Sequence, residues 1–235
     1  MTPMRPNAFG RLALAILLTT AVLAACSSTP PPPDWQMNAQ SAVERAADAW
    51  LAGNDRVAQA EITRARSEVA RTGQPALAAR LELAHCATRV AALVFDACEG
   101  YAPLAIDAAA PEQAYARYLQ GEAGSADAER LPSAQRPLAQ ASLAGAGTDL
   151  APALARIDDP LSRLVAAGVL LRRGQASPAV VADAVATASA QGWRRPLMAW
   201  LRVQQERARS GGGAEDDVQR LQRRIELVGG PSPTK

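Results

Sequence analysis

The chain has 235 residues, of which 49% are hydrophobic and 20% charged, enough for one domain with a full hydrophobic core or for two small domains. Its 25 Lys and Arg residues and 23 Asp and Glu residues give a formal net charge of +2. This near balance gives no excess of basic charge to drive binding of nucleic acid or adhesion to an anionic lipid surface.

The first segment of the chain is typical of a secretory signal peptide. Residues 1–11 carry Arg5 and Arg11 and no acidic residue, and residues 12–25 are apolar apart from two threonines. This run of 14 residues is shorter than the roughly 20 that a membrane-spanning helix needs. A basic start, a short apolar run and small residues at its end together predict a leader that is removed from the mature protein. We therefore expect residues 1–25 to be the signal peptide.

The leader ends in the tetrapeptide Leu23-Ala24-Ala25-Cys26, which resembles the lipobox of bacterial lipoproteins. This resemblance implies that Cys26 is acylated, for example with palmitate, and becomes the first residue of the mature chain. The membrane partner would then be the lipid on Cys26. In lipoproteins of Gram-negative bacteria, a residue other than Asp after the cysteine implies the outer membrane, and here that residue is Ser27. The alternative is an ordinary signal peptide with a chance cysteine.

A proline-rich tether follows the cysteine. The stretch SSTPPPP ends at Pro33, and such a sequence favours an extended polyproline II conformation, which would hold the folded part roughly 20 Å from the bilayer. We expect residues 26–36 to be the lipidated tether, residues 37–229 an all-helical domain and residues 230–235 a flexible tail. The mature chain would carry 23 basic and 23 acidic residues, because the leader contains two arginines and no acid.

Helix-forming residues dominate the remainder of the chain. Ala, Leu, Arg and Glu are abundant, and no segment shows sustained alternation of β-branched or aromatic residues with polar ones. The sequence therefore predicts an all-α fold. Capping residues, prolines and glycines divide it into helices near residues 38–52, 55–72, 75–95, 111–120, 133–144, 149–157, 160–173, 178–191, 195–209 and 214–228.

The ends of several predicted helices carry specific signals. Asp159-Pro160 and Ser177-Pro178 each place a capping side chain before a proline at the first helical position. Four glycines follow periodic segments, where a left-handed residue commonly ends a helix. They are Gly53, Gly73, Gly174 and Gly192.

The segment Pro75–Phe95 differs from the other predicted helices. Apolar residues cover most of its circumference, and only Glu82, His85 and Arg89 form a narrow polar strip at helical spacing. A helix that is apolar on most sides packs against several others, so we expect it to be central. Trp200 is expected in the core, and Trp193 could line a groove.

The first two predicted helices resemble a tetratricopeptide repeat, with small residues where the helices touch and a glycine at the turn. The matching positions are Ala46, Gly53, Ala58, Ile62 and Ala65. Trp50 is one place from the usual aromatic position of that repeat, and residues 160–192 form a looser copy. The resemblance implies antiparallel hairpins stacked as a solenoid or a compact helical array. The whole chain also resembles uncharacterised proteobacterial lipoproteins of similar layout, which implies no activity.

Two cysteines remain if Cys26 is lipidated. Cys86 and Cys98 would be about 18 Å apart in one straight helix, so they can form a disulfide only if the chain reverses after the helix. The periplasm permits such a bond. The alternative is a pair of buried free thiols.

The residues that commonly carry catalysis are scarce. His85 is the only histidine, and no nucleophile, metal or phosphate-binding motif is present, so we expect no catalytic residue, no metal site and no cofactor. Glycoside hydrolysis needs only two acids beside a cleft. Glu99 and Glu112 lie in residues 96–131, where the pattern is least regular. Three tyrosines lie near them, Tyr101, Tyr115 and Tyr118.

Two functional hypotheses follow. The first is an outer-membrane-anchored periplasmic lipoprotein that acts as a non-enzymatic, helical protein-interaction or scaffold module, with envelope or periplasmic proteins as partners and no nucleic acid. The second is an envelope hydrolase that acts on peptidoglycan through the carboxylates of residues 96–131.

Overall fold

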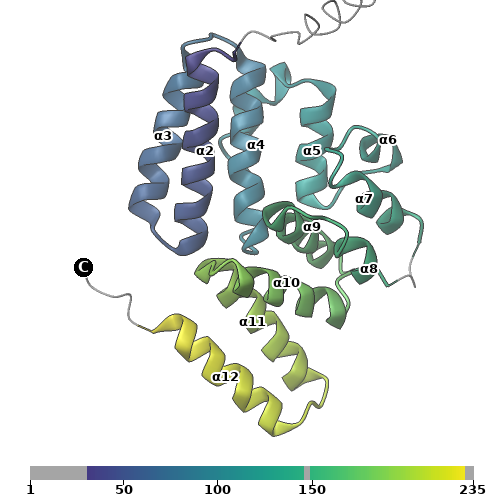
Figure 1. Ribbon diagram of the computed structural model, residues 1–235. Coiled ribbons are helices and arrows are strands. Elements are labelled where there is room, and N and C mark those ends of the chain that lie inside the picture. Colours follow the sequence, from purple (N-terminus) through teal and green to yellow (C-terminus); the bar gives the residue numbers. More distant parts are fainter. Residues whose placement is uncertain (1–30, 146–148, 231–235) are drawn as a thin grey trace, which may run out of the picture. The chain divides into compact units, whose positions relative to one another are not determined.

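The computed structural model describes residues 31–145 and 149–230, and every regular element in these ranges is a helix (Figure 1). The all-α fold class is therefore confirmed. The chain divides into two units, Met1–Pro33 and Asp34–Lys235, and the helices belong to the second. Within the described ranges, no helix combines the length and the apolar character that crossing a membrane requires. Cys26 and the predicted leader lie outside the described residues.

Ten of the helices correspond to the ten predicted from the sequence. They are α2 (Asp34–Ala52), α3 (Asp55–Ala70), α4 (Pro75–Ala91), α5 (Ala110–Gln120), α7 (Arg136–Leu143), α8 (Ala151–Leu154), α9 (Pro160–Arg172), α10 (Pro178–Ala190), α11 (Arg194–Ser210) and α12 (Glu215–Gly229). Two further short elements, the 3-10 helix η1 (Ala102–Asp107) and α6 (Ser125–Ala128), lie in the segment that showed no regular pattern. Helix α2 begins at Asp34, so the last three residues of the predicted tether are helical.

The predicted helix caps are present. The Asp159 carboxylate accepts a hydrogen bond from the Ser162 backbone N–H at 2.7 Å, and the Ser177 hydroxyl accepts one from the Val180 N–H at 3.3 Å. Each cap satisfies a backbone donor that the first turn of a helix leaves unpaired. The four glycines predicted to follow helices all have positive φ, which a residue with a side chain rarely adopts.

Helix α4 ends four residues earlier than the sequence indicated. Its last residue is Ala91 rather than Phe95, and the chain then reverses through Leu93, which has a φ of +62°. The Val94 N–H donates to the Arg89 carbonyl at 3.0 Å across this turn. The apolar pattern continues to Phe95 because the residues after the turn are also apolar, although they no longer belong to the helix.

Helix α4 occupies the centre of the helical unit. It packs against α2, α3, α5, α9 and η1. Its side chains Leu83, Cys86 and Val90 belong to the main core, which also contains residues from the later helices. Trp200 of α11 is fully buried and donates its indole N–H to the Ala91 carbonyl at 3.1 Å, so the end of α4 is also joined to α11. The sequence-based expectation for Trp200 is confirmed.

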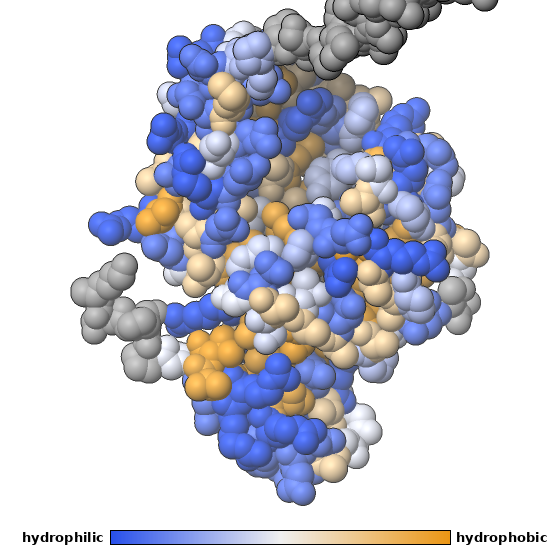
Figure 2. Space-filling model, in the orientation of Figure 1, coloured by the Kyte–Doolittle hydropathy of each residue, from blue (hydrophilic) through white to orange (hydrophobic). Residues whose placement is uncertain are grey.

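The N-terminal hairpin α2–α3 has a small core to which Leu81 of α4 also belongs. Ala42 and Ala65 are completely buried between the two helices, and Ile62 is nearly so. Small side chains allow the helix backbones to approach closely. Figure 2 shows hydrophilic residues over most of the outer face of this hairpin and a more apolar patch over α11 and α12.

Candidate functional site

The polar strip of α4 faces a groove that we call the His85 groove. It consists of two adjoining hollows that share His85 and Arg89, with volumes of about 380 and about 220 Å³. The first hollow lies between α3, α4 and the segment after α4, and the second between α2, α3 and α4. The charged residues that line it are Asp55, Arg66, Glu82, Arg89, Asp96 and Glu99.

One wall of the groove is held by an ion pair between α3 and α4. The guanidinium of Arg66 donates to both carboxylate oxygens of Glu82, at 2.6 and 2.8 Å. Hydrogen bonding to Glu82 raises the pKa of Arg66 above its ordinary value. Gly100 lies directly over this carboxylate, because a Cβ at position 100 would lie 2.1 Å from a Glu82 oxygen. A side chain at position 100 would therefore displace the Glu82 carboxylate from its place beside Arg66.

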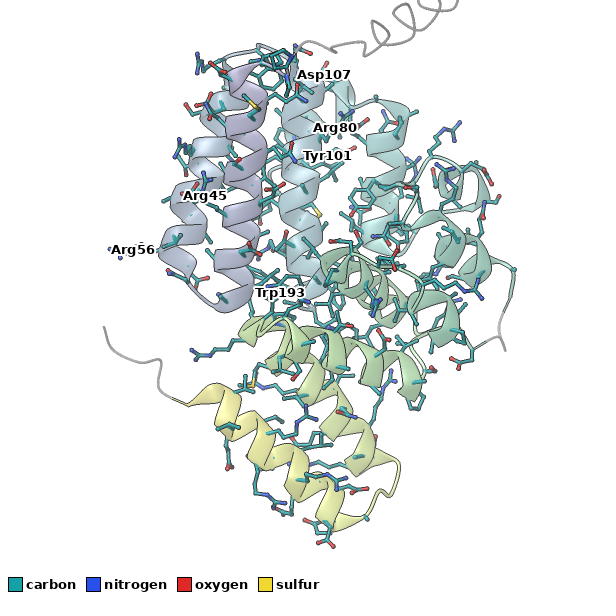
Figure 3. The ribbon with its side chains drawn as sticks, viewed as in Figure 1. Arg45, Arg56, Arg80, Tyr101, Asp107 and Trp193 are labelled. Atoms are coloured by element: carbon teal, nitrogen blue, oxygen red, sulfur yellow. A yellow bond between two sulfur atoms is a disulfide. The ribbon has the colours of Figure 1, made fainter. Side chains whose placement is uncertain are left out.

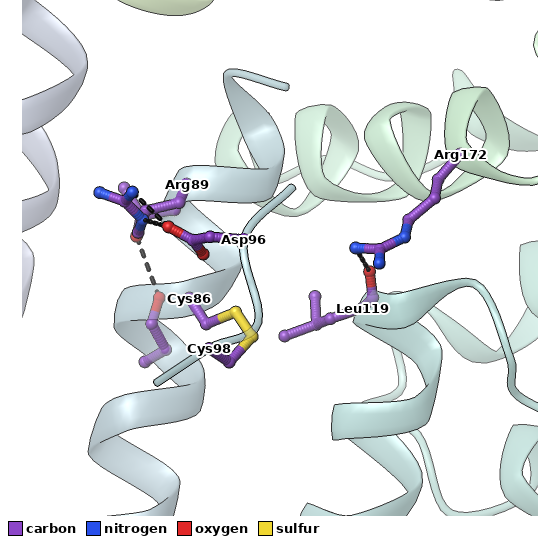
Figure 4. The surroundings of a disulfide bond; sticks show 8 residues. Cys86, Arg89, Asp96, Cys98, Leu119 and Arg172 are labelled. Atoms are coloured by element: carbon purple, nitrogen blue, oxygen red, sulfur yellow. Dashed lines mark hydrogen bonds and ion pairs between the residues drawn. A yellow bond between two sulfur atoms is a disulfide. The ribbon is translucent and has the colours of Figure 1, made fainter. Parts of the chain in front are cut away.

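A second ion pair joins α4 to the segment that follows it. Arg89 donates through Nε to the Asp96 carboxylate at 2.7 Å, and a second guanidinium nitrogen contacts the same oxygen. The Arg89 guanidinium also lies 5.6 Å from the ring centre of Trp50, on which Arg195 stacks from α11 at 4.4 Å. Figure 4 shows the Arg89–Asp96 pair beside the disulfide. Together these contacts order the other wall of the groove.

The two cysteines of the central region form a disulfide in the structure. Cys86 of α4 is bonded to Cys98, with the Cα atoms 5.4 Å apart (Figure 4). The bond fixes the segment after α4 against the helix, and this segment supplies Asp96, Glu99 and Gly100 to the groove. The disulfide therefore supports the groove wall and leaves Cys86 and Cys98 without a thiol.

His85 lies between the two ion pairs. Burial is the main cause that lowers the pKa of His85 below its ordinary value of 6.5. The Glu82 carboxylate opposes this shift, whereas the nearby cations Arg66 and Arg89 add to it and Asp96 opposes it weakly. At neutral pH the imidazole is therefore mainly neutral, with one nitrogen that donates and one that accepts. It forms no hydrogen bond with any side chain or backbone group of the described chain.

The structure does not bring the two predicted carboxylates of residues 96–131 together. Glu99 lines the His85 groove, whereas Glu112 lines a separate recess between α4, α5 and residues 130–136. Arg80 holds one Glu112 oxygen through two nitrogens, at 2.6 and 2.8 Å. The arrangement gives no single cleft in which both acids would flank a substrate.

Two tyrosines of this region, Tyr101 and Tyr118, are buried, and Tyr115 is half-buried. The rings of Tyr115 and Tyr118 stack with their centres 6.0 Å apart, and the Tyr118 hydroxyl donates to Gln135 at 3.0 Å. Burial raises the pKa of both phenols above the ordinary value. Trp193 is half-buried and packs against the core near the start of α11 (Figure 3).

Several residues of the groove were not identified from the sequence. Arg66 and Asp96 had no local signal, because Arg66 is 16 residues from Glu82 and Asp96 reaches Arg89 only after the chain reverses. The strip of Glu82, His85 and Arg89 was visible, and the sequence interpretation treated it as the polar side of a buried helix. These three polar residues stand alone on an otherwise apolar helix, and this was the one feature of the sequence that could have indicated the groove.

The described residues define an all-helical protein with a polar groove beside its central helix. Comparison with known proteins yields no match, since no family model, no curated protein and no solved structure is significantly similar to the chain. Among the described residues, no cluster of three or more His, Cys, Asp or Glu side chains could hold a metal ion. What the groove offers chemically is hydrogen bonding and charge complementarity.

Proposed function

We propose that the protein is an outer-membrane-anchored periplasmic lipoprotein that acts as a non-enzymatic interaction module, with the His85 groove as its contact surface. The lipid on Cys26 and the proline-rich tether would hold the helical unit at the membrane. The tetratricopeptide-like pattern of the first hairpin supports a role in protein binding, because stacked helical hairpins form extended surfaces for partners.

The observation that carries this proposal is that the side chains lining the groove are held in fixed positions. A bidentate ion pair, a second ion pair and a disulfide fix the side chains that line it. A surface that is already ordered loses little conformational entropy when it binds a partner. Two polar groups of the groove, the His85 imidazole and the Glu99 carboxylate, form no hydrogen bond within the described chain and remain available for hydrogen bonds with a partner.

The charge of the groove indicates the chemistry of the partner. In the hollow that contains Glu99, two arginines face three acids, and Arg66 and Arg89 are each paired with one of them. Glu99 is the remaining negative charge. We therefore expect a polypeptide segment that presents a basic side chain to Glu99 and a hydrogen-bonding group to His85.

Site-specific photo-crosslinking in intact cells tests the proposal. A photoreactive residue replaces Gln59 or Glu99, which line the two hollows, and replaces the exposed Gln219 of α12 as a control. We expect the same protein adduct from both groove positions and not from position 219. With the photoreactive residue at position 59, Glu99→Arg should reduce the yield of the adduct, because it replaces the unpaired negative charge of Glu99 with a positive one.

Two outcomes would contradict the proposal. One is an adduct that forms equally from Gln219 and from the groove. The other is a groove adduct that survives both Glu99→Arg and His85→Ala without change, because the groove would then not select its partner through the groups described above.

A further inference from the structure

The recess that contains Glu112 lies outside the His85 groove and has a different chemistry. We call it the α4–α5 recess. It has a volume of about 390 Å³ and is formed by α4, the first two turns of α5 and residues 130–136, which lead into α7. This volume falls in the range of about 300–1,000 Å³ that is usual for small-molecule sites. Figure 3 shows Arg80 and Tyr101 in the region where α4 faces α5.

Glu112 lines this recess and carries an unsatisfied acceptor. Its side chain is only 7% exposed, and Arg80 engages one oxygen, Oε1. The other oxygen, Oε2, is buried and accepts no hydrogen bond from the described protein. A buried polar atom without a partner costs about 1–3 kcal/mol, and more when it is charged. Oε2 is therefore suited to a ligand that brings its own donor, above all an ammonium group.

Two arginines of the recess form no ion pair, although Asp127 lies near enough to Arg130 for an electrostatic interaction. Arg130 and Arg136 line the part of the recess that residues 130–136 form, and each donates to a backbone carbonyl, that of Ala126 and of Leu131 respectively. Neither forms an ion pair within the described residues. Counting Arg80 and Glu112 as well, the recess has three cations and one anion. An arginine side chain binds a carboxylate through two parallel hydrogen bonds, so this side of the recess favours an anionic group.

Apolar groups complete the wall between the two polar regions. Leu83 of α4 and Leu131 are almost completely buried behind the recess, and the Tyr115 ring, Pro111 and Pro132 also line it. A ligand that filled the recess would bury an apolar body against these side chains while its ends met Glu112 and the arginines. Burial of apolar surface would supply much of its affinity.

We propose that the α4–α5 recess binds an apolar α-amino acid or short peptide as a zwitterion. The ammonium group donates to Glu112 Oε2, the carboxylate accepts from Arg130 and Arg136, and the apolar side chain packs on Leu83, Leu131 and Tyr115. A simple anion would leave Oε2 unpaired, and a simple amine would leave two arginines without an ion pair. The zwitterion alone satisfies all three parts of the recess.

Calorimetric titration of the full mature lipoprotein in detergent tests this site with defined probes. The probes are leucyl-leucine, its N-acetyl derivative, its C-terminal amide and inorganic phosphate, each at about 1 mM and above. We expect leucyl-leucine to bind, and we expect the acetyl and amide derivatives to bind at least about tenfold more weakly, equivalent to about 1.4 kcal/mol each. Phosphate should not compete with the dipeptide at equal concentration.

Variants separate the two polar ends of the site. Glu112→Gln should weaken the dipeptide about tenfold or more and leave binding of the N-acetyl derivative unchanged. Because Glu112→Gln also removes the Arg80 ion pair, the exposed Arg136→Gln provides a second variant that should weaken the dipeptide and not the amide. Arg56→Gln is the control, since Arg56 projects from α3 away from the recess (Figure 3).

Three results would overturn the proposal. The first is no binding of leucyl-leucine to a protein that is folded by circular dichroism. The second is equal binding of all three leucine derivatives, which would indicate an apolar site without recognition of charge. The third is displacement of the dipeptide by phosphate, which would indicate an anion site. None of these three results involves the His85 groove, so each would overturn the proposed ligand site without contradicting the proposed interaction role.

Discussion

Gly168 of α9 lies where this helix crosses α4. An ideal Cβ at position 168 would lie 2.5 Å from the Val90 carbonyl oxygen, closer than side chains approach backbone atoms in folded proteins. We therefore predict that Gly168→Ala lowers the free energy of unfolding by about 1–3 kcal/mol, although alanine is the better helix former. Urea unfolding of the two proteins measures the difference.

The matched control is Gly124→Ala. Gly124 has an ordinary φ of −95°, and a Cβ there would meet nothing within 4 Å. This change should alter stability by only a few tenths of a kcal/mol, since alanine is slightly poorer than glycine before a helix. Equal effects at Gly168 and Gly124 would mean that α4 and α9 are not in close contact.

His85 gives the protein a defined pH dependence. Its pKa in the folded state is lower than the ordinary 6.5, chiefly through burial. The unfolded chain therefore takes up a proton at a higher pH than the folded protein, so stability is full above pH 6.5 and declines as the pH falls below it. We predict a lower urea midpoint at about pH 5.5 than at about pH 7.5. Because His85 is the only histidine, His85→Gln should reduce this difference.

The Cys86–Cys98 bond permits a direct chemical test. Protein purified from the periplasmic side and alkylated without reductant should show no label on Cys86 or Cys98 by mass spectrometry. Reduction should lower the free energy of unfolding by about 3 kcal/mol in the chain-entropy description. Full labelling of both cysteines in denatured protein would show free thiols, and packing alone would then hold the segment after α4.

At the scale of the helices, the burial of α4 predicts unequal effects for the same substitution. Leu83 is 2% exposed in the main core, whereas Leu227 of α12 is 84% exposed. Leu83→Ala should cost about 2–5 kcal/mol of unfolding free energy, because it removes buried contacts and leaves a cavity. Leu227→Ala should cost less than about 0.5 kcal/mol. Thermal and urea unfolding compare them, and a small effect at Leu83 would place α4 at the periphery.

Local sequence signals were sufficient to place most of the helices. Caps such as Asp159 and Ser177 act within three residues, so their effect can be inferred from the sequence. The short helices η1 and α6 could not be inferred, because six and four residues are too few to show a period. The end of α4 was predicted too late in the chain, because the turn that ends it depends on a positive φ at Leu93. Leucine rarely adopts such a φ, so its presence gives no signal for a turn.

The candidate site was less predictable than the fold. Arg66–Glu82 and Arg80–Glu112 join residues 16 and 32 positions apart, and only packing brings them together. The sequence interpretation named Glu112 as a candidate acid beside Glu99. In the structure Glu112 lines a separate recess, and only one of its two carboxylate oxygens accepts a hydrogen bond. This property can be recognised only when the positions of all neighbouring groups are known.

At the scale of the whole molecule, the two proposed sites depend on where the helical unit is held. The mature sequence would be electrically neutral, with 23 acidic and 23 basic residues, so nonspecific attraction would not bring it to a charged membrane or partner. Stable anchoring by lipid needs more than a single acyl chain, and the multiple acylation of a lipoprotein cysteine would supply this. The anchor would then determine which partners the His85 groove meets.

The final prediction tests that anchor through Cys26 and the residue after it. Cys26→Ala removes the group that would receive the lipid, so the variant should accumulate as an unprocessed precursor or as soluble periplasmic protein. Ser27→Asp keeps the cysteine and should move the lipidated protein from the outer to the inner membrane in a Gram-negative host. Density-gradient fractionation with immunoblotting measures both. If Cys26→Ala fractionates with the outer membrane like the parent, some feature other than a lipid on this cysteine holds the protein there.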